Sequence, residues 1–222
     1  MKVRLPTTRL LSTLLTLHLA AGLCASGAAA QQRAAAPRTE PIARITYSGE
    51  MASLLAKMAQ EFGVNVGLVI DANQLRRPVK LDLNYPTMPD VLDAVVKSAP
   101  GFEWRETVGG VEVSTVRGGS ALLDAPISSF RVSDVDQAEA VELLMSLPEV
   151  RASLAEMNLQ YRSPGGAAAR SAGERFSLEL EGMSLRQALN KIVERSGSRF
   201  WLFRKFGGAP EGDFITIGIK DR

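Results

Sequence analysis

The residues best able to carry chemistry in this sequence are carboxylates, and Asp82, Asp90 and Asp93 stand close together along the chain. Two carboxylates that face each other across a cleft hydrolyse glycosidic bonds, so one hypothesis is a carboxylate-based hydrolase acting on glycan. The expected positions of the three residues are the polar faces of a strand and a helix. Charged side chains on such faces are usually solvated, and we therefore favour a structural role for them.

The composition argues against most other kinds of catalytic site and metal site. The only cysteine, Cys24, and the only histidine, His18, lie within the segment 1–30. Without that segment the chain has no Ser-His-Asp or Cys-His arrangement, and zinc would have to be held by carboxylates alone. The sequence also lacks the spacing S-x-x-K, an EF-hand loop and a phosphate-binding glycine motif. We therefore expect no catalytic residue, no cofactor and no metal site.

The amino-terminal segment, residues 1–30, predicts an export signal. Three basic residues precede an apolar run at 10–23, and small residues then end in an A-x-A cleavage pattern at Ala30. The apolar run is shorter than the roughly 20 residues of a spanning helix. We expect cleavage after Ala30, a periplasmic location and no membrane insertion of the mature chain. An uncleaved anchor stays open, as does a lipid on Cys24, although Leu23 is bulkier than lipoprotein processing prefers.

The charge of the remaining chain argues against nucleic acid as a partner. The segment 1–30 contains three basic residues and no acidic one, so its removal takes the formal net charge from +2 to −1. Phosphate binding needs clustered Lys and Arg, and no basic stripe is visible after Ala30. With 45% hydrophobic and 23% charged residues, the sequence is otherwise typical of a folded globular protein.

We divide the sequence after Ala30 into a leader and two stretches of domain size. The leader, residues 31–41, is polar and contains two prolines, which indicates a flexible segment. The first stretch spans 42–118 and the second spans 127–220, with the glycine-rich Gly118-Gly119-Ser120 between them. The second stretch contains an insertion at about 148–175, rich in glycine, alanine, serine and arginine toward its end.

The two stretches repeat one pattern when residue i is set beside residue i+97. The alternating segment 79–83 then faces 176–180, and each is followed by a Ser or Thr N-cap and a helix with the same apolar stripe. In the same register Trp104 falls on Trp201, and these are the only tryptophans in the chain. A gap-free register over this length indicates an internal duplication.

Each copy predicts the order strand, helix, strand, strand, helix, strand, strand. The fold class is therefore α+β, with two tandem βαββαββ modules and two helices per module packed on small mixed sheets. In the second copy Pro148 breaks a helix, and the strand after the first helix is weak, with 157–161 as its only candidate. In the first copy the expected elements are residues 42–47, 51–62, 64–70, 79–85, 88–98, 102–107 and 111–116.

The most characteristic part of the first copy is a helix that runs into a strand ending in an acidic turn. The residues that carry the pattern are Leu54-Leu55, Met58-Ala59, Phe62-Gly63-Val64-Asn65-Val66, Val69-Ile70-Asp71, Val79-Lys80-Leu81-Asp82-Leu83, Phe102-Glu103-Trp104 and Val111-Glu112-Val113. The pattern resembles the secretin and TonB short N-terminal domain, a periplasmic module. The resemblance covers about 42–117 well and 127–219 more loosely. It implies non-catalytic docking to other proteins of the bacterial envelope. The alternative function is a carboxylate-based hydrolase that acts on envelope glycan.

The strand predicted at 199–206 is unusual because it is apolar on both faces. In the register set by Trp201, the residues Phe200, Leu202 and Phe206 lie on the face that is charged in the first copy. An apolar face requires a cover, and two interpretations stay open. Either the first copy or the long loop packs there, or the three residues bind a partner protein, for example by strand addition at a sheet edge. The sequence identifies no envelope partner and leaves open whether the chain forms a homo-oligomer.

Overall fold

The computed structural model describes residues 40–74, 76–115, 121–164, 174–208 and 212–219, all within one structural unit. The predicted export signal, the leader up to residue 39 and the glycine-rich joint at 118–120 lie outside the described residues. The same is true of residues 165–173 in the predicted insertion. In the described ranges no helix is both long and apolar enough to span a membrane.

The first half of the chain, residues 44–115, follows the predicted order of elements. Helix α1 buries one apolar face and ends at Gly63, whose positive φ of 67° suits a residue without a side chain. Helix α2 begins with a capping box between Thr87 and Asp90. The elements are β1 (Arg44–Glu50), α1 (Met51–Phe62), β2 (Val66–Asp71), the 3-10 helix η1 (Ala72–Gln74), β3 (Pro78–Asn84), α2 (Met88–Ser98), β4 (Phe102–Thr107) and β5 (Gly110–Thr115).

The second half, residues 121–219, repeats this order with one additional helix. The predicted break at Pro148 separates α3 from α4, since proline suits the first turn of a helix but not its interior. The weak strand is present as β7, with only three residues. Two helices were expected in this half, and the structure has three, α3, α4 and α5. The elements are η2 (Ala121–Asp124), β6 (Pro126–Val135), α3 (Gln137–Met145), α4 (Pro148–Glu156), β7 (Leu159–Tyr161), β8 (Phe176–Ser184), α5 (Leu185–Ser196), β9 (Phe200–Phe206) and β10 (Asp213–Ile219).

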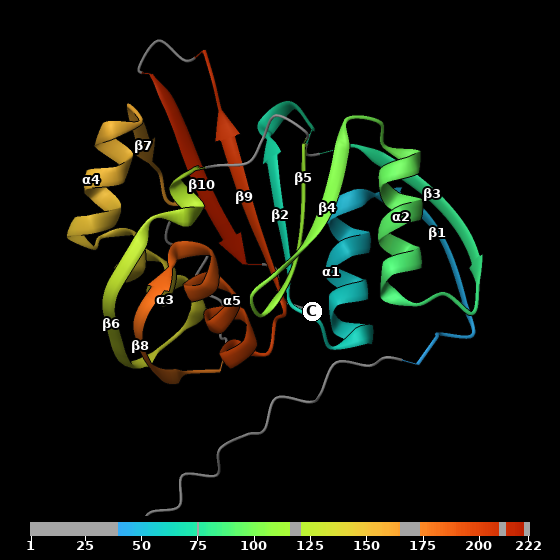
Figure 1. The fold of residues 1–222 in the computed structure, drawn as a ribbon, viewed down its shortest axis with the longest axis horizontal. Helices are drawn as coiled ribbons and strands as arrows, with labels where there is room; N and C mark the ends of the chain where they lie inside the picture. The colour runs from blue at the N-terminus through green and yellow to red at the C-terminus, as the bar shows by residue number, and fades with distance from the viewer. Residues whose placement is uncertain (1–39, 75, 116–120, 165–173, 209–211, 220–222) are drawn as a thin grey trace, which may run out of the picture. The chain divides into compact units, whose positions relative to one another are not determined.

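The strands form an α+β fold with two antiparallel pairs, β1-β3 and β6-β8, and one mixed sheet in the order β4-β5-β2-β9-β10-β7 (Figure 1). The mixed sheet contains three strands from each half. Its halves meet where β2 and β9 pair in parallel, from Val66 opposite Phe200 to Asp71 opposite Lys205. The separate small sheets expected for each copy are thus joined into one at this position.

The two halves contribute their strands to the mixed sheet in the same pattern. In the first half β5 pairs antiparallel with β4 and parallel with β2, and in the second half β10 pairs antiparallel with β9 and parallel with β7. Because β5, β2 and β9 all run in one direction, β9 runs opposite to β4, its counterpart in the first half. The second half therefore enters the sheet with its strands reversed.

Two hydrophobic clusters lie on opposite faces of the mixed sheet. Leu68 of β2 belongs to the cluster that contains the buried residues of α1 and α2, whereas its neighbour Val69 belongs to the cluster of α3 and α5. The same division occurs in β9, where Phe200 lies in the first cluster and Trp201 in the second. Since consecutive residues of a strand point to opposite faces, the helices of the two halves cover opposite faces of the sheet. Strand β2 up to Ile70 and the beginning of β9, from Phe200 to Phe203, are covered on both faces.

Candidate functional site

The three residues predicted as a partner-binding surface lie on one face of β9 but in different surroundings. Phe200 is fully buried in the cluster of the first half, and Leu202 is half-buried against the same cluster. The first half therefore covers both residues, which is one of the two interpretations that the sequence left open. Phe206 lies further along the strand, belongs to neither hydrophobic cluster and is half-buried, as Leu202 is. Of the three, Phe206 is the one that the core of neither half holds.

The junction of the halves depends on a close approach between β2 and the indole of Trp201. The ring lies against Gly67, whose strand partner across the junction is Trp201 itself. A Cβ atom built on Gly67 would overlap the ring atom Cζ2 and lie 2.6 Å from Cε2 and from Cη2. Only glycine leaves room for the ring at this position. The sequence analysis did not single out Gly67, although a lone glycine within an apolar strand is typical of a close approach by another group.

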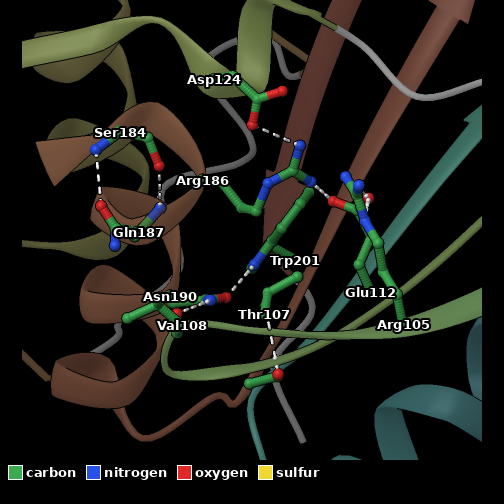
Figure 2. A network of polar contacts seen from close by, with 11 residues as sticks. Arg105, Thr107, Val108, Glu112, Asp124, Ser184, Arg186, Gln187, Asn190 and Trp201 are labelled. Carbon is green, nitrogen blue, oxygen red and sulfur yellow. Dashed lines mark hydrogen bonds and ion pairs between the residues drawn. The ribbon is translucent and has the colours of Figure 1, made fainter.

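Asn190 of α5 connects the indole to the β4–β5 hairpin of the first half, because it accepts one hydrogen bond and donates another. The Nε1 of Trp201 donates to Oδ1 of Asn190 over 2.8 Å, and the Nδ2 of Asn190 donates to the carbonyl of Val108 over 3.1 Å (Figure 2). At the next residue of the hairpin, the Nδ2 of Asn65 donates to the carbonyl of Gly109 over 2.9 Å. Asn190 is 2% exposed, so the bond between the indole and Asn190 is shielded from water.

A buried ion-pair network also joins the two halves. The carboxylate of Glu112 on β5 is almost fully buried and pairs with Arg186 of α5 and with the half-exposed Arg105, whose Nη2 lies 2.9 Å from Oε1 (Figure 2). Arg186 also pairs with Asp124 over 2.9 Å. Burial lowers the pKa of Arg186 to about 10, so the guanidinium is still charged at neutral pH and Glu112 offsets that charge. Breaking such a pair on one side costs about 3–5 kcal/mol.

The carboxylates that suggested a hydrolase have structural partners. Asp82 on β3 accepts hydrogen bonds from Arg44 of β1, and Asp90 accepts from Thr87 in the capping box. These bonds hold the pKa of Asp82 and the pKa of Asp90 below the usual value, by stabilising the charged form. A general acid in glycan hydrolysis needs a raised pKa, so both shifts run in the opposite direction.

The third carboxylate, Asp93, accepts a hydrogen bond from Nε1 of Trp104 over 2.7 Å. This bond ties α2 to β4 within the first half, in the way that Asn190 and Trp201 tie α5 to β9 in the second. Within the part of the chain that the structure describes, no group of three or more His, Cys, Asp or Glu side chains could hold a metal ion. In the described structure the three aspartates thus take part in a surface ion pair, a helix cap and a bond between helix and strand.

Phe206 belongs to a cluster of two phenylalanines and two arginines. The rings of Phe206 and Phe214 are stacked, with centroids 4.4 Å apart and planes inclined by 5°. The Cζ of Arg162 lies 4.2 Å from the centroid of Phe214, and the Cζ of Arg204 lies 5.9 Å from that of Phe206. We call these four residues the arginine–phenylalanine cluster. The sequence pointed to Phe206 alone, since Arg162 falls in the predicted insertion and meets Phe214 only in three dimensions.

No family model matches the chain, and neither the search of curated proteins nor that of solved structures found a match. The resemblance of residues 42–117 to the short N-terminal domain of secretins therefore stays a prediction from sequence. The location and the partners that this resemblance implies stay predictions as well.

Proposed function

We propose that this chain is a non-catalytic docking module of the bacterial cell envelope, which its segment 1–30 directs to the periplasm. In this proposal residues 42–118 and 127–220 are two related modules of the short N-terminal domain type. They bind another envelope protein through surfaces of the mixed sheet. The export signal and the family resemblance, both predicted from the sequence, support the location.

The observation that carries the proposal is the way β9 binds β2 within the chain. A strand of the second half adds to the sheet of the first half by parallel main-chain pairing over six residues and inserts Phe200 into its core. Strand addition with side-chain anchors is a common mode of peptide and protein recognition. The fold thus already recognises a strand from outside its own half, and a partner strand can use the same mode.

The mixed sheet keeps two outer strands for such contacts. Among the described residues β4 pairs only with β5, and β7 pairs only with β10. The positions of β4 that match Phe200 and Leu202 at the offset of 97 are Glu103 and Arg105. Charged residues on an edge strand oppose pairing between identical copies. We therefore favour a different protein as the partner over a second copy of this chain.

The docking proposal is tested by site-specific cross-linking in the periplasm. A photo-reactive phenylalanine is placed at Glu106 on β4, at Gln160 on β7, or at the exposed Arg151 on α4 as the matched control. We expect one discrete adduct from at least one edge position and none from Arg151. The cross-linked protein is then purified, and its binding to the mature chain is measured by calorimetry. Absence of an adduct at both edges, with the chain folded, would contradict the proposal.

Two further measurements address the remaining parts of the proposal. Amino-terminal sequencing of the chain recovered from periplasm should begin at Gln31, and an intact Met1 would contradict processed export. Incubation of the mature chain with purified peptidoglycan should release no fragments. Release that disappears with a variant of Asp82, Asp90 or Asp93 would instead support the hydrolase alternative.

A further inference from the structure

Strand β5 divides its main-chain hydrogen bonds between β2 and β4. The N–H of Val111 donates over 2.9 Å to the carbonyl of Asn65, the residue just before β2. The main-chain polar groups of consecutive strand residues point to alternate sides, so those of the next residue, Glu112, point to β4. The residue of β4 opposite Glu112 is Arg105. On β4 it is therefore Arg105 that directs its N–H and carbonyl to β5.

The residues on either side of Arg105, Trp104 and Glu106, direct their N–H and carbonyl groups away from β5. Strand β4 is the outermost strand of the mixed sheet at this end, and among the described residues it pairs with β5 alone (Figure 1). The stretch lies between helix α2 and the β4–β5 hairpin, both of which the structure describes. An unpaired edge of this kind is a template for an added strand.

The edge of β4 carries two exposed glutamates, one on each face of the sheet. Glu106 shares the face of Trp104, which packs against the cluster of the first half, and Glu103 shares the face of Arg105. Within the described ranges neither glutamate has a hydrogen bond or an ion pair. Beside Trp104, the carboxylate of Asp93 adds a further negative charge. Both faces of the edge are thus acidic.

The one cation of β4 is already balanced. The Nε and Nη2 of Arg105 donate to Oε1 of Glu112 over 3.2 and 2.9 Å. The network that continues from Glu112 to Arg186 and Asp124 contains two arginines and two carboxylates, so its formal charges cancel (Figure 2). The charge that the edge offers to a partner is therefore negative, and side chains of opposite charge stabilise directly opposed strands.

We infer that β4 binds a basic, extended segment of the envelope partner, which adds antiparallel to its outer edge. Glu103 and Glu106 are three residues apart, and residues three apart in the added strand also point to opposite faces. Directly opposed side chains have Cβ atoms about 4.5–5.5 Å apart. A segment with the order Lys-Thr-Val-Lys thus sets one lysine opposite each glutamate and the valine opposite Trp104. This inference rests on the proposed docking function and names the chemistry of the partner.

The test uses the mature chain and a fluorescein-labelled extended peptide with Lys-Thr-Val-Lys at its centre. Fluorescence anisotropy should show saturable binding. Glu103→Gln and Glu106→Gln should each weaken binding about two- to fivefold, because each removes one cross-strand charge pair. Glu156→Gln, which removes the same charge from exposed α4, should leave the affinity unchanged.

Two further measurements test the geometry of the added strand. A peptide of the same composition with the order Lys-Thr-Lys-Val has both lysines on one face, so it should bind about two- to fivefold more weakly. Saturation with the first peptide should slow amide hydrogen exchange at Trp104 and Glu106 by at least about tenfold. Glu106→Pro removes an outward N–H that β5 does not use, so it should keep the fold and abolish binding.

Several results would overturn the inference. They are no saturable binding up to about 1 mM peptide, equal affinity for the two peptides, equal losses for Glu156→Gln and Glu106→Gln, or unchanged exchange at Trp104 and Glu106. Circular dichroism and thermal unfolding check the fold of each variant, and the two glutamine variants decide the question if Glu106→Pro is unfolded. A partner cross-linked through Gln160 alone, together with a peptide that does not bind, would refute this site while the docking function stands.

Discussion

The substitution Gly67→Ala tests whether the two halves are joined by the close contact between β2 and Trp201. The added methyl group would overlap Cζ2 of the indole and lie 2.6 Å from two further ring atoms. The ring cannot easily move away, because it is 1% exposed and its Nε1 is bound to Asn190. Either the strands separate or the indole shifts and loses that hydrogen bond.

The expected cost follows from these two effects. Overpacking a dense core costs about 1–3 kcal/mol, and leaving Asn190 and the indole nitrogen unpaired costs about 1–3 kcal/mol more. We therefore expect Gly67→Ala to lower the free energy of unfolding by about 2–6 kcal/mol. For a chain of this size the melting temperature should fall by about 4–24 °C. Urea unfolding of the mature chain, followed by tryptophan fluorescence and circular dichroism, measures the free energy.

The matched control is Gly218→Ala, the same change at a strand position with no neighbour within 4 Å of the new atom. We expect it to alter stability by less than about 0.5 kcal/mol. In the background Trp201→Phe, which removes the overlapping part of the ring, Gly67→Ala should cost less than about 1 kcal/mol. Equal stability of Gly67→Ala and Gly218→Ala, or an unchanged cost in the Trp201→Phe background, would refute this account of the junction.

Three other predictions concern stability. Phe200→Ser should lower the free energy of unfolding by about 3–5 kcal/mol, because Phe200 lies in the core of the first half. A folded variant with an unchanged urea midpoint would contradict this and would support a role of Phe200 in partner binding. Glu112→Gln should cost about 3–5 kcal/mol by removing the buried carboxylate that pairs with Arg186, whose other partner, Asp124, is 68% exposed, and a urea midpoint near that of the unaltered chain would contradict this prediction. The hydrogen bonds from Thr87 lower the pKa of Asp90, so they stabilise the folded chain above the ordinary pKa of 3.8, and this contribution is lost as the pH falls through the folded-state value. The melting temperature of Asp90→Asn should consequently fall less steeply between about pH 5 and pH 2 than that of the unaltered chain, and identical slopes would contradict the prediction.

The local elements could be predicted because their signals lie close together in the sequence. The apolar stripe of 51–62 and the glycine at its end specify α1 within a single segment. Thr87 and Asp90 cap α2 across three residues, and Pro148 divides α3 from α4 by its own geometry. The strand pattern of each half likewise follows from alternation and from the shared register. The arginine–phenylalanine cluster was found only in part. The strand register indicates Phe206, whereas Arg162, Arg204 and Phe214 come together with it only in the folded chain.

The sequence by itself determined the elements and their caps, since each depends on residues near one another, and its repeated spacing predicts the duplication. Tertiary structure decided that β2 and β9 pair in parallel, that the second half enters the sheet reversed, and that Phe200 lies in the core of the first half. These features depend on contacts between residues far apart along the chain, such as Gly67 with Trp201 and Asn65 with Arg199. No local preference encodes such a contact. The helices of each half cover one face of the mixed sheet, so β2 and β9 obtain a cover on both faces by lying beside each other where the halves meet.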